Sequence, residues 1–167
     1  MIKRPQPIFV ARNHFDAVGT DIQTRIKGTE DRCIELCRGT PSCVGYTYDR
    51  WNNECHTKSN IWSLRLEAKA VSGFREGFSI PDAASSEVRI DRLLTAPGRL
   101  DNRRLEGNLL ATVSANSPED CRANCLNDRQ CMGVTYKSAS RECRKFSQVD
   151  NHFEDNSGTL TSAVKRQ

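Results

Sequence analysis

The sequence predicts an α+β protein made of two tandem small domains, each an antiparallel β-sheet packed on one α-helix and held by two disulfides. Three observations lead to this prediction. The eight cysteines fall into two sets of four with identical spacing. Each set starts in a segment with strong helix-start signals, and a segment with strand periodicity follows it. Only 37% of the 167 residues are hydrophobic, which is lean for one large core but ordinary for small cross-linked domains.

The second half of the chain repeats the first half at an offset of 88 residues. In both residues 33–55 and residues 121–143, three, five and eleven residues separate the successive cysteines. Between the cysteines, residues 44–48 resemble residues 132–136, and Glu54 matches Glu142. We therefore expect one domain at residues 7–78 and a second at residues 89–167. The stretch 79–88 is small, polar and contains a proline, which is typical of a linker.

Each repeat contains one predicted helix of about ten residues. Ser117 is a good N-cap, Pro118 suits the first helical position, and two acidic residues follow in the first turn. Thr29 occupies the N-cap position in the first repeat. The helices should end near residues 39–41 and 127–128. Each predicted helix contains two cysteines, and these are four residues apart. Both sulfurs should therefore lie on one face of the helix.

The segments after the helices predict β-hairpins. Residues 44–48 and 132–136 alternate in the period of a strand, and a polar turn follows each of them. Cys55 and Cys143 then lie on the return strands. We expect further short strands before each helix and after each hairpin.

Disulfides explain the cysteines better than zinc or catalysis. Zinc sites usually combine two C-x2–4-C pairs on tight turns, whereas each repeat has only one such pair, inside a helix. A catalytic cysteine needs an unpaired thiol and a base, and none of the three histidines recurs at its partner position in the other repeat. We therefore predict no catalytic residue, no metal site and no cofactor.

Four cysteines allow three connectivities in each repeat. We favour the one in which a short bridge joins the helix end to the next strand, and a long bridge joins the helix start to the hairpin's return strand. The favoured pairs are Cys33–Cys55 and Cys37–Cys43 in the first repeat, and Cys121–Cys143 and Cys125–Cys131 in the second.

The helical C-x3-C, the strand that ends in Thr-Tyr and the cysteine after a polar turn together resemble the PAN/apple domain superfamily. The resemblance covers both repeats and is to the short four-cysteine bacterial type, because the third bridge of apple domains proper is missing in both. It implies a twisted antiparallel sheet that cradles one helix, with helix-to-sheet disulfides. It also implies a secreted or periplasmic adhesion module without catalytic activity. Bacterial members often occur in tandem within larger exported proteins, beside protease-like or alpha-macroglobulin-like regions.

The predicted function is therefore a non-enzymatic, extracytoplasmic binding or adhesion module that recognises protein or carbohydrate, as part of a larger exported bacterial protein. One alternative is a targeting or regulatory region of an exported protease-like or alpha-macroglobulin-like protein. A second alternative is a zinc-stabilised intracellular domain pair. Residues 1–10 contain no hydrophobic signal core, so an exported chain should be a mature segment behind an added Met1.

Charge and hydropathy argue against two kinds of partner. The formal net charge is only +4 and is spread over the whole chain, which is a weak argument for nucleic acid. No apolar run approaches the roughly 20 residues of a membrane helix. We expect neither nucleic-acid binding nor membrane insertion, and the sequence leaves the oligomeric state open.

The candidate ligand contacts lie at the hairpin tip of the first repeat, at Arg50, Trp51, Asn52 and Asn53. Exposed aromatic residues and arginines are favoured at binding hot spots. Trp51 can stack on a sugar or fill a protein pocket; the alternative is that it folds back over the sheet edge. Trp62 lies among aliphatic residues and is expected in the core. The second repeat has no aromatic residue at its tip, so the repeats are not expected to share one mode of binding.

Overall fold

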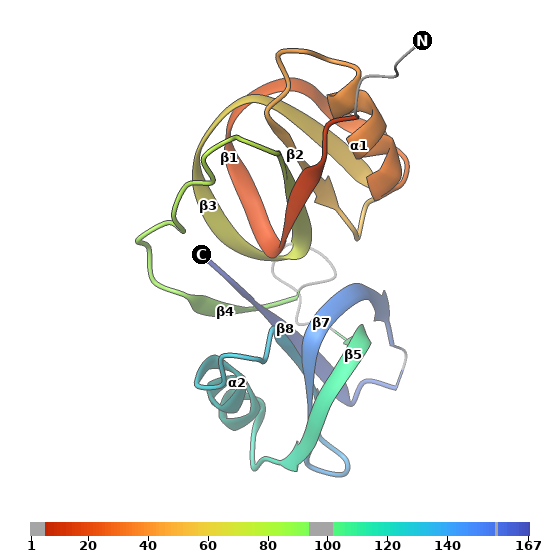
Figure 1. Cartoon of the computed structure of the whole chain (residues 1–167). Helices are drawn as coiled ribbons and strands as arrows, with labels where there is room; N and C mark the ends of the chain where they lie inside the picture. The colour runs from red at the N-terminus through yellow and green to blue at the C-terminus, as the bar shows by residue number, and fades with distance from the viewer. Residues whose placement is uncertain (1–5, 94–101, 156) are drawn as a thin grey trace. The chain divides into compact units, whose positions relative to one another are not determined.

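The computed structural model describes residues 6–93, 102–155 and 157–167, which form two compact units, residues 1–85 and 86–167. Each unit contains one short helix and a mostly antiparallel sheet (Figure 1), so the predicted fold class is confirmed. The first unit contains β1 (Phe9–Lys27), α1 (Glu30–Arg38), β2 (Gly45–Asp49) and β3 (Glu54–Arg75). The second contains β4 (Arg89–Arg92), β5 (Arg103–Ser114), α2 (Pro118–Leu126), β6 (Gly133–Lys137), β7 (Glu142–Glu154) and β8 (Leu160–Arg166).

Both helices begin and end where their local sequence predicts. The side chain of Thr29 accepts a hydrogen bond from the backbone N–H of Arg32, and Ser117 accepts one from Asp120 in the same way. Each cap satisfies one of the donors that the first helical turn leaves without a partner. Each helix is nine residues long and buries its two cysteines.

The strands of the first domain are longer than predicted. β1 has 19 residues and β3 has 22, and they pair antiparallel from Phe9 opposite Arg75 to Lys27 opposite Glu54. Several register shifts interrupt this pairing, and His14, with φ of 66°, lies at one of them. Such bulges let a strand turn a corner without ending, so one long curved ribbon (Figure 1) replaces several short strands. In the second domain β4 and β5 take the place of β1, and β7 and β8 take the place of β3.

The central strand of each domain is the short one after the helix. The strand β2 lies between the two ends of the long strand β3, which we call its arms: residues 54–58 and residues 70–74. Tyr48 of β2 lies opposite Cys55 in the first arm and opposite Val71 in the second. On both sides the partner numbers fall as the β2 numbers rise, which is the register of antiparallel neighbours. β6 lies between β7 and β8 in the same way. All five residues of β2 are buried. The alternation in its sequence therefore reflects two buried faces of different polarity, and not one buried and one exposed face.

One face of the central strand packs on the cysteines. In the first domain, Tyr46 and Tyr48 join the four cysteines and Val71 in one buried cluster. In the second domain, Val134 and Tyr136 do the same with their own cysteines.

The other face carries a buried pair of hydroxyl groups that recurs in both domains. Thr47 Oγ1 lies 2.8 Å from Ser72 Oγ, and the backbone N–H of Ala17 donates to Thr47 Oγ1 at 2.9 Å. Ser72 Oγ donates to the carbonyl of Phe15 at 2.7 Å, so the proton between the two hydroxyls comes from Thr47. The equivalent groups in the second domain are Thr135, Ser162, Leu105 and Arg103. The pair therefore connects β1, β2 and β3, and likewise β5, β6 and β8.

The prediction that Trp62 lies in the core is wrong. Its side chain is 60% exposed, while its neighbour Ile61 is 4% exposed and packs on Phe74. Successive side chains of a strand point to opposite faces, so the burial of Ile61 directs Trp62 towards solvent.

The predicted domain bounds stay a prediction. Part of the stretch proposed as a linker, residues 79–88, is hydrogen-bonded to β3. The N–H of Leu64 donates to the carbonyl of Asp82 at 3.3 Å, and the N–H of Ala84 donates to the carbonyl of Leu64 at 2.6 Å. Ile80 packs on the same apolar cluster as Ile61. Neither helix in the described part of the chain is long and apolar enough to cross a membrane.

Candidate ligand-binding site

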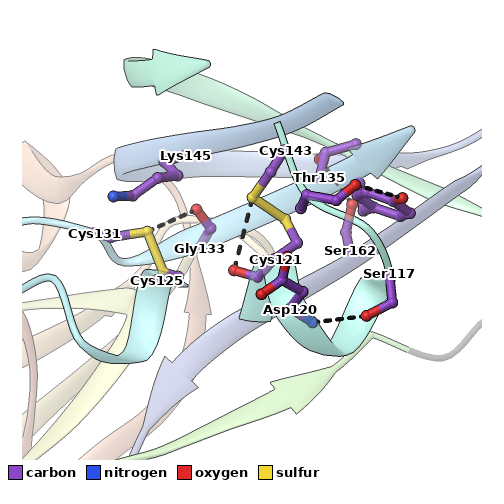
Figure 2. The surroundings of a disulfide bond; sticks show 12 residues. Ser117, Asp120, Cys121, Cys125, Cys131, Gly133, Thr135, Cys143, Lys145 and Ser162 are labelled. Carbon is purple, nitrogen blue, oxygen red and sulfur yellow. Dashed lines mark hydrogen bonds between the residues drawn. A yellow bond between two sulfur atoms is a disulfide. The ribbon is translucent and has the colours of Figure 1, made fainter. Parts of the chain in front are cut away.

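The eight cysteines form four disulfides, two in each domain. The pairs are Cys33–Cys55, Cys37–Cys43, Cys121–Cys143 and Cys125–Cys131, the same pairs that the sequence favoured. Figure 2 shows the second set, with one bridge from α2 to β7 and one from the helix end to the loop before β6. All eight residues are fully buried.

This pairing removes the basis for the zinc alternative. A zinc ligand or a cysteine nucleophile must be a thiolate, and every cysteine here is in a disulfide. Over the described ranges, no group of three or more His, Cys, Asp or Glu side chains is placed to hold a metal ion. The cysteines therefore build the scaffold, and a ligand must be held by other residues.

The four predicted contact residues lie in the turn between β2 and β3, and Asp49 organises this turn. The Asp49 carboxylate accepts hydrogen bonds from the backbone N–H groups of Trp51 and Asn52, at 3.0 and 3.1 Å, and from the side-chain amide of Asn52 at 2.8 Å. Lys69 lies 3.4 Å from the same carboxylate. Asp49 itself is only 7% exposed. The tip is therefore held in one conformation before any ligand arrives.

The pKa of Asp49 reflects these contacts. Burial by itself would raise the pKa of this carboxyl group, because burial penalises the charged form. The hydrogen bonds from Asn52 and the positive charge of Lys69 outweigh burial and hold the pKa below its usual value. Asp49 is consequently a carboxylate at neutral pH.

The four tip residues differ in how much surface they offer. Arg50 is half-buried; its backbone N–H donates to the carbonyl of Lys69 at 2.8 Å and its guanidinium donates to that of Ala68 at 2.7 Å. Asn53 has φ of 53° and accepts a hydrogen bond from the Tyr48 hydroxyl at 3.1 Å. Asn52 and Asn53 are exposed and Trp51 is half-buried. Arg50 thus secures the tip, while the other three residues present surface to solvent.

A cavity of about 280 Å³ lies beside this tip, on the Thr47 face of the sheet. Nine residues line it: Asp16, Thr47, Asp49, His56, Lys58, Arg65, Glu67, Lys69 and Ala70. Because Asp49 both lines the cavity and holds the tip, the two features adjoin at this residue. Residues 50–53 and the nine lining residues are called the Asp49 site below.

The lining of the cavity is polar and its charges balance. Three carboxylates (Asp16, Asp49, Glu67) and three cations (Lys58, Arg65, Lys69) give a formal charge of zero with His56 counted as neutral. Arg65 donates to Asp16 at 2.7 Å, and Lys58 pairs with Asp21 outside the lining. Lys58 is 7% exposed and Glu67 is 8% exposed.

Sequence reasoning predicted the tip but missed the cavity. The cavity arises where the two arms of β3 and the central β2 meet, which brings together residues up to 54 positions apart. One signal was present: Arg65, Glu67 and Lys69 place alternating charges at every second position, which puts them on one face of a strand.

Family comparison accounts for the repeated scaffold. A model of the PAN domain family matches residues 9–74 and residues 98–165. The chain belongs to the PAN domain family. PAN and apple domains are in general protein- or carbohydrate-binding modules of extracellular proteins and are typically not enzymes. The two disulfides in each domain are consistent with an extracellular location.

Among solved structures, the chain is similar to the two N-terminal apple domains of Toxoplasma gondii microneme protein 4, determined in solution. The two chains share 14% sequence identity with a TM-score of 0.35, over 91% of this chain and 86% of the other. No curated protein matches the chain.

The second PAN domain does not repeat the charges of the cavity. At the 88-residue offset, Lys137 stands where the first domain has Asp49, Arg144 stands for His56, and Phe146 stands for Lys58. Thr135 preserves only the buried hydroxyl of Thr47. The Asp49 site is therefore particular to the first PAN domain; that the repeats differ in their mode of binding stays a prediction.

Proposed function

We propose that this tandem PAN chain is a non-enzymatic binding module of a larger exported bacterial protein, which recognises protein or carbohydrate outside the cytoplasm through its first domain. In such a protein it serves adhesion, or it directs an attached protease-like or alpha-macroglobulin-like region to its target. The full reading frame distinguishes these two settings. The binding role is the same in both.

One observation carries the proposal: a buried, ionised Asp49 fixes the tip and at the same time lines a polar cavity. A prepared tip binds with less loss of conformational freedom than a mobile loop, so more of the contact energy appears as affinity. Trp51 adds a large, rigid, partly exposed surface, which is the kind of side chain that dominates binding hot spots. The tip and the cavity together offer stacking and hydrogen bonds to one ligand.

The test is the change Trp51→Ala in the whole chain, compared with the unchanged protein on an array of glycans and extracellular proteins. Truncation of a hot-spot tryptophan costs 2 kcal/mol or more, so affinity for the captured ligand should fall by about thirtyfold. The matched control is Trp62→Ala, because Trp62 is also in the first domain but lies outside the Asp49 site. It should leave affinity unchanged.

Equal affinities of Trp51→Ala and the unchanged protein would remove Trp51 from the site. Capture of no glycan and no protein by the unchanged chain would overturn the proposed function itself. Thermal unfolding of each variant, followed by far-ultraviolet circular dichroism, shows that the fold is intact.

A further inference from the structure

We propose that the cavity of the Asp49 site binds one residue of an uncharged saccharide, and that each chain has a single such site. This inference rests on the proposed function and narrows it to a ligand class. It follows from the charge balance, the burial, the hydrogen-bonding pattern and the size of the cavity, and from the contrast with the second domain.

The formal charge balance of the lining argues against a strongly charged ligand. The carboxylates and cations of the lining cancel, and two cation–carboxylate pairs lie within it: Arg65 with Asp16 at 2.7 Å and Lys69 with Asp49 at 3.4 Å. A ligand with a net charge would leave one charge uncompensated in a partly buried site, which is costly. A zwitterion would have to compete with these existing pairs. An uncharged ligand meets neither cost.

Burial indicates a ligand that is rich in hydrogen-bonding groups. Asp49, Lys58 and Glu67 are each less than 10% exposed although they line an open cavity. Buried charged groups are tolerated where hydrogen bonds surround them. A hydroxyl group is both a donor and an acceptor, so it can serve a carboxylate and a cation at once without breaking their ion pair.

The strand geometry supplies a regular series of donors and acceptors. Arg65, Glu67 and Lys69 are alternate residues of β3, so they follow one another at roughly 6.6 Å as donor, acceptor and donor. The Arg65 guanidinium has five N–H donors and its bond to Asp16 uses one of them. A sugar ring, whose hydroxyls point outward in several directions, fits such a series better than an apolar group does.

Size and polarity limit the ligand further. The cavity of about 280 Å³ lies just below the range of about 300–1,000 Å³ that is typical of small-molecule sites. Ala70 is the single apolar residue among the nine that line it. A ligand as small and polar as one sugar residue satisfies both limits.

The experiment is a titration of the isotope-labelled whole chain, monitored by NMR, with the methyl glycosides of glucose, galactose, mannose and N-acetylglucosamine. Glucuronate, glucosamine and glycine serve as acidic, basic and zwitterionic probes. We expect at least one uncharged glycoside to give saturable shifts confined to the lining residues, with one site per chain. The three charged probes should give none there.

Two variants locate the site. Arg65→Met should weaken binding of that glycoside at least tenfold because it removes donors from the cavity wall. The matched control is Arg144→Met in the second domain: the two arginine side chains are 50% and 48% exposed, and each lies near a carboxylate. The control should bind as the unchanged chain does. Since Arg65 is half-exposed, its replacement should leave the fold intact, and the amide spectrum verifies this.

Three results would overturn the inference: charged probes that shift the lining residues while uncharged ones do not, affinity that Arg65→Met leaves unchanged, or two equivalent sites per chain. If no uncharged glycoside binds but the array of glycans and extracellular proteins captures a protein partner, the saccharide inference fails and the proposed function stands. If the array captures nothing, the proposed function fails as well.

Discussion

At the scale of single residues, Asp49 shows how one buried carboxylate can prepare a surface. It occupies the last position of β2, and three hydrogen bonds from Trp51 and Asn52 converge on it. Its position could be read from the sequence, but its role could not. The hairpin turn that follows a strand is a local property, whereas the ion pair that helps to keep Asp49 charged is made with Lys69, twenty residues away.

Replacement of Asp49 by asparagine should destabilise the first domain by about 1–3 kcal/mol at neutral pH, since hydrogen bonds to a buried charged group are lost or weakened. The folded-state pKa of Asp49 is lowered, so its stabilising contribution is complete above the unfolded pKa of about 3.9 and is lost as the pH falls through the folded pKa. Urea unfolding at pH 7 and below pH 4 measures the difference.

The free energies of the unchanged protein and Asp49→Asn should converge in acid. Asp150→Asn is the control, because Asp150 is exposed and lies in the second domain. A gap between the protein and Asp49→Asn that is equally large at both pH values would contradict the role assigned to the Asp49 carboxylate.

At the scale of elements, the central strands β2 and β6 organise the two domains in the same way. One face of each packs on the disulfides, and the other face carries the paired hydroxyls of a threonine and a serine. This arrangement explains why Thr47 and Thr135 recur at the same position of the repeat although they are almost completely buried. A buried hydroxyl is retained where it satisfies backbone groups of a neighbouring strand.

Substitution of either threonine by valine should cost its domain about 1–3 kcal/mol, because the shape is kept while a buried backbone N–H loses a hydrogen-bond acceptor. The effect should be smaller in the first domain, where the Ala17 N–H also donates to Ser72 Oγ at 3.1 Å. Hydrogen exchange should locate the damage: the Ala17 amide should exchange faster in Thr47→Val, and the Leu105 amide in Thr135→Val. Thr112→Val, at an exposed position of β5, should change neither amide. Unaltered exchange at Leu105 in Thr135→Val would show that the threonine hydroxyl does not hold this strand.

At the scale of the whole molecule, two similar scaffolds carry different surfaces. Each domain has its own cysteine cluster and its own pair of bridges. Only the first combines the tip with the balanced cavity described above. A scaffold that is held by its own cross-links leaves the residues between the cysteines able to vary, as the exchange of Asp49 for Lys137 illustrates.

The two bridges of a domain should differ in their contribution to stability. On a chain-entropy model, loss of the short Cys37–Cys43 bridge costs about 2 kcal/mol and loss of the longer Cys33–Cys55 bridge about 3 kcal/mol. Paired Cys→Ala variants test this by denaturant unfolding. Both tryptophans, Trp51 and Trp62, lie in the first domain, so their fluorescence reports that domain alone.

The second domain provides the control for this comparison. Removal of Cys121–Cys143 or Cys125–Cys131 should leave the tryptophan transition in place while it destabilises the second domain, as followed by amide exchange. A larger loss from the short bridge than from the long one in both domains would contradict the chain-entropy ranking.

The sequence by itself determined the features that depend on neighbouring residues. The cysteine repeat fixed two domains, Ser117 and Thr29 fixed the helix starts, and the polar turn after β2 identified the tip. Tertiary structure decided the rest. Register shifts bend β1 and β3 into long ribbons, and this bending brings distant charges around one cavity. The packing of Ile61 on Phe74 decides that Trp62 is exposed, because the face that a strand buries is set by its partners across the sheet.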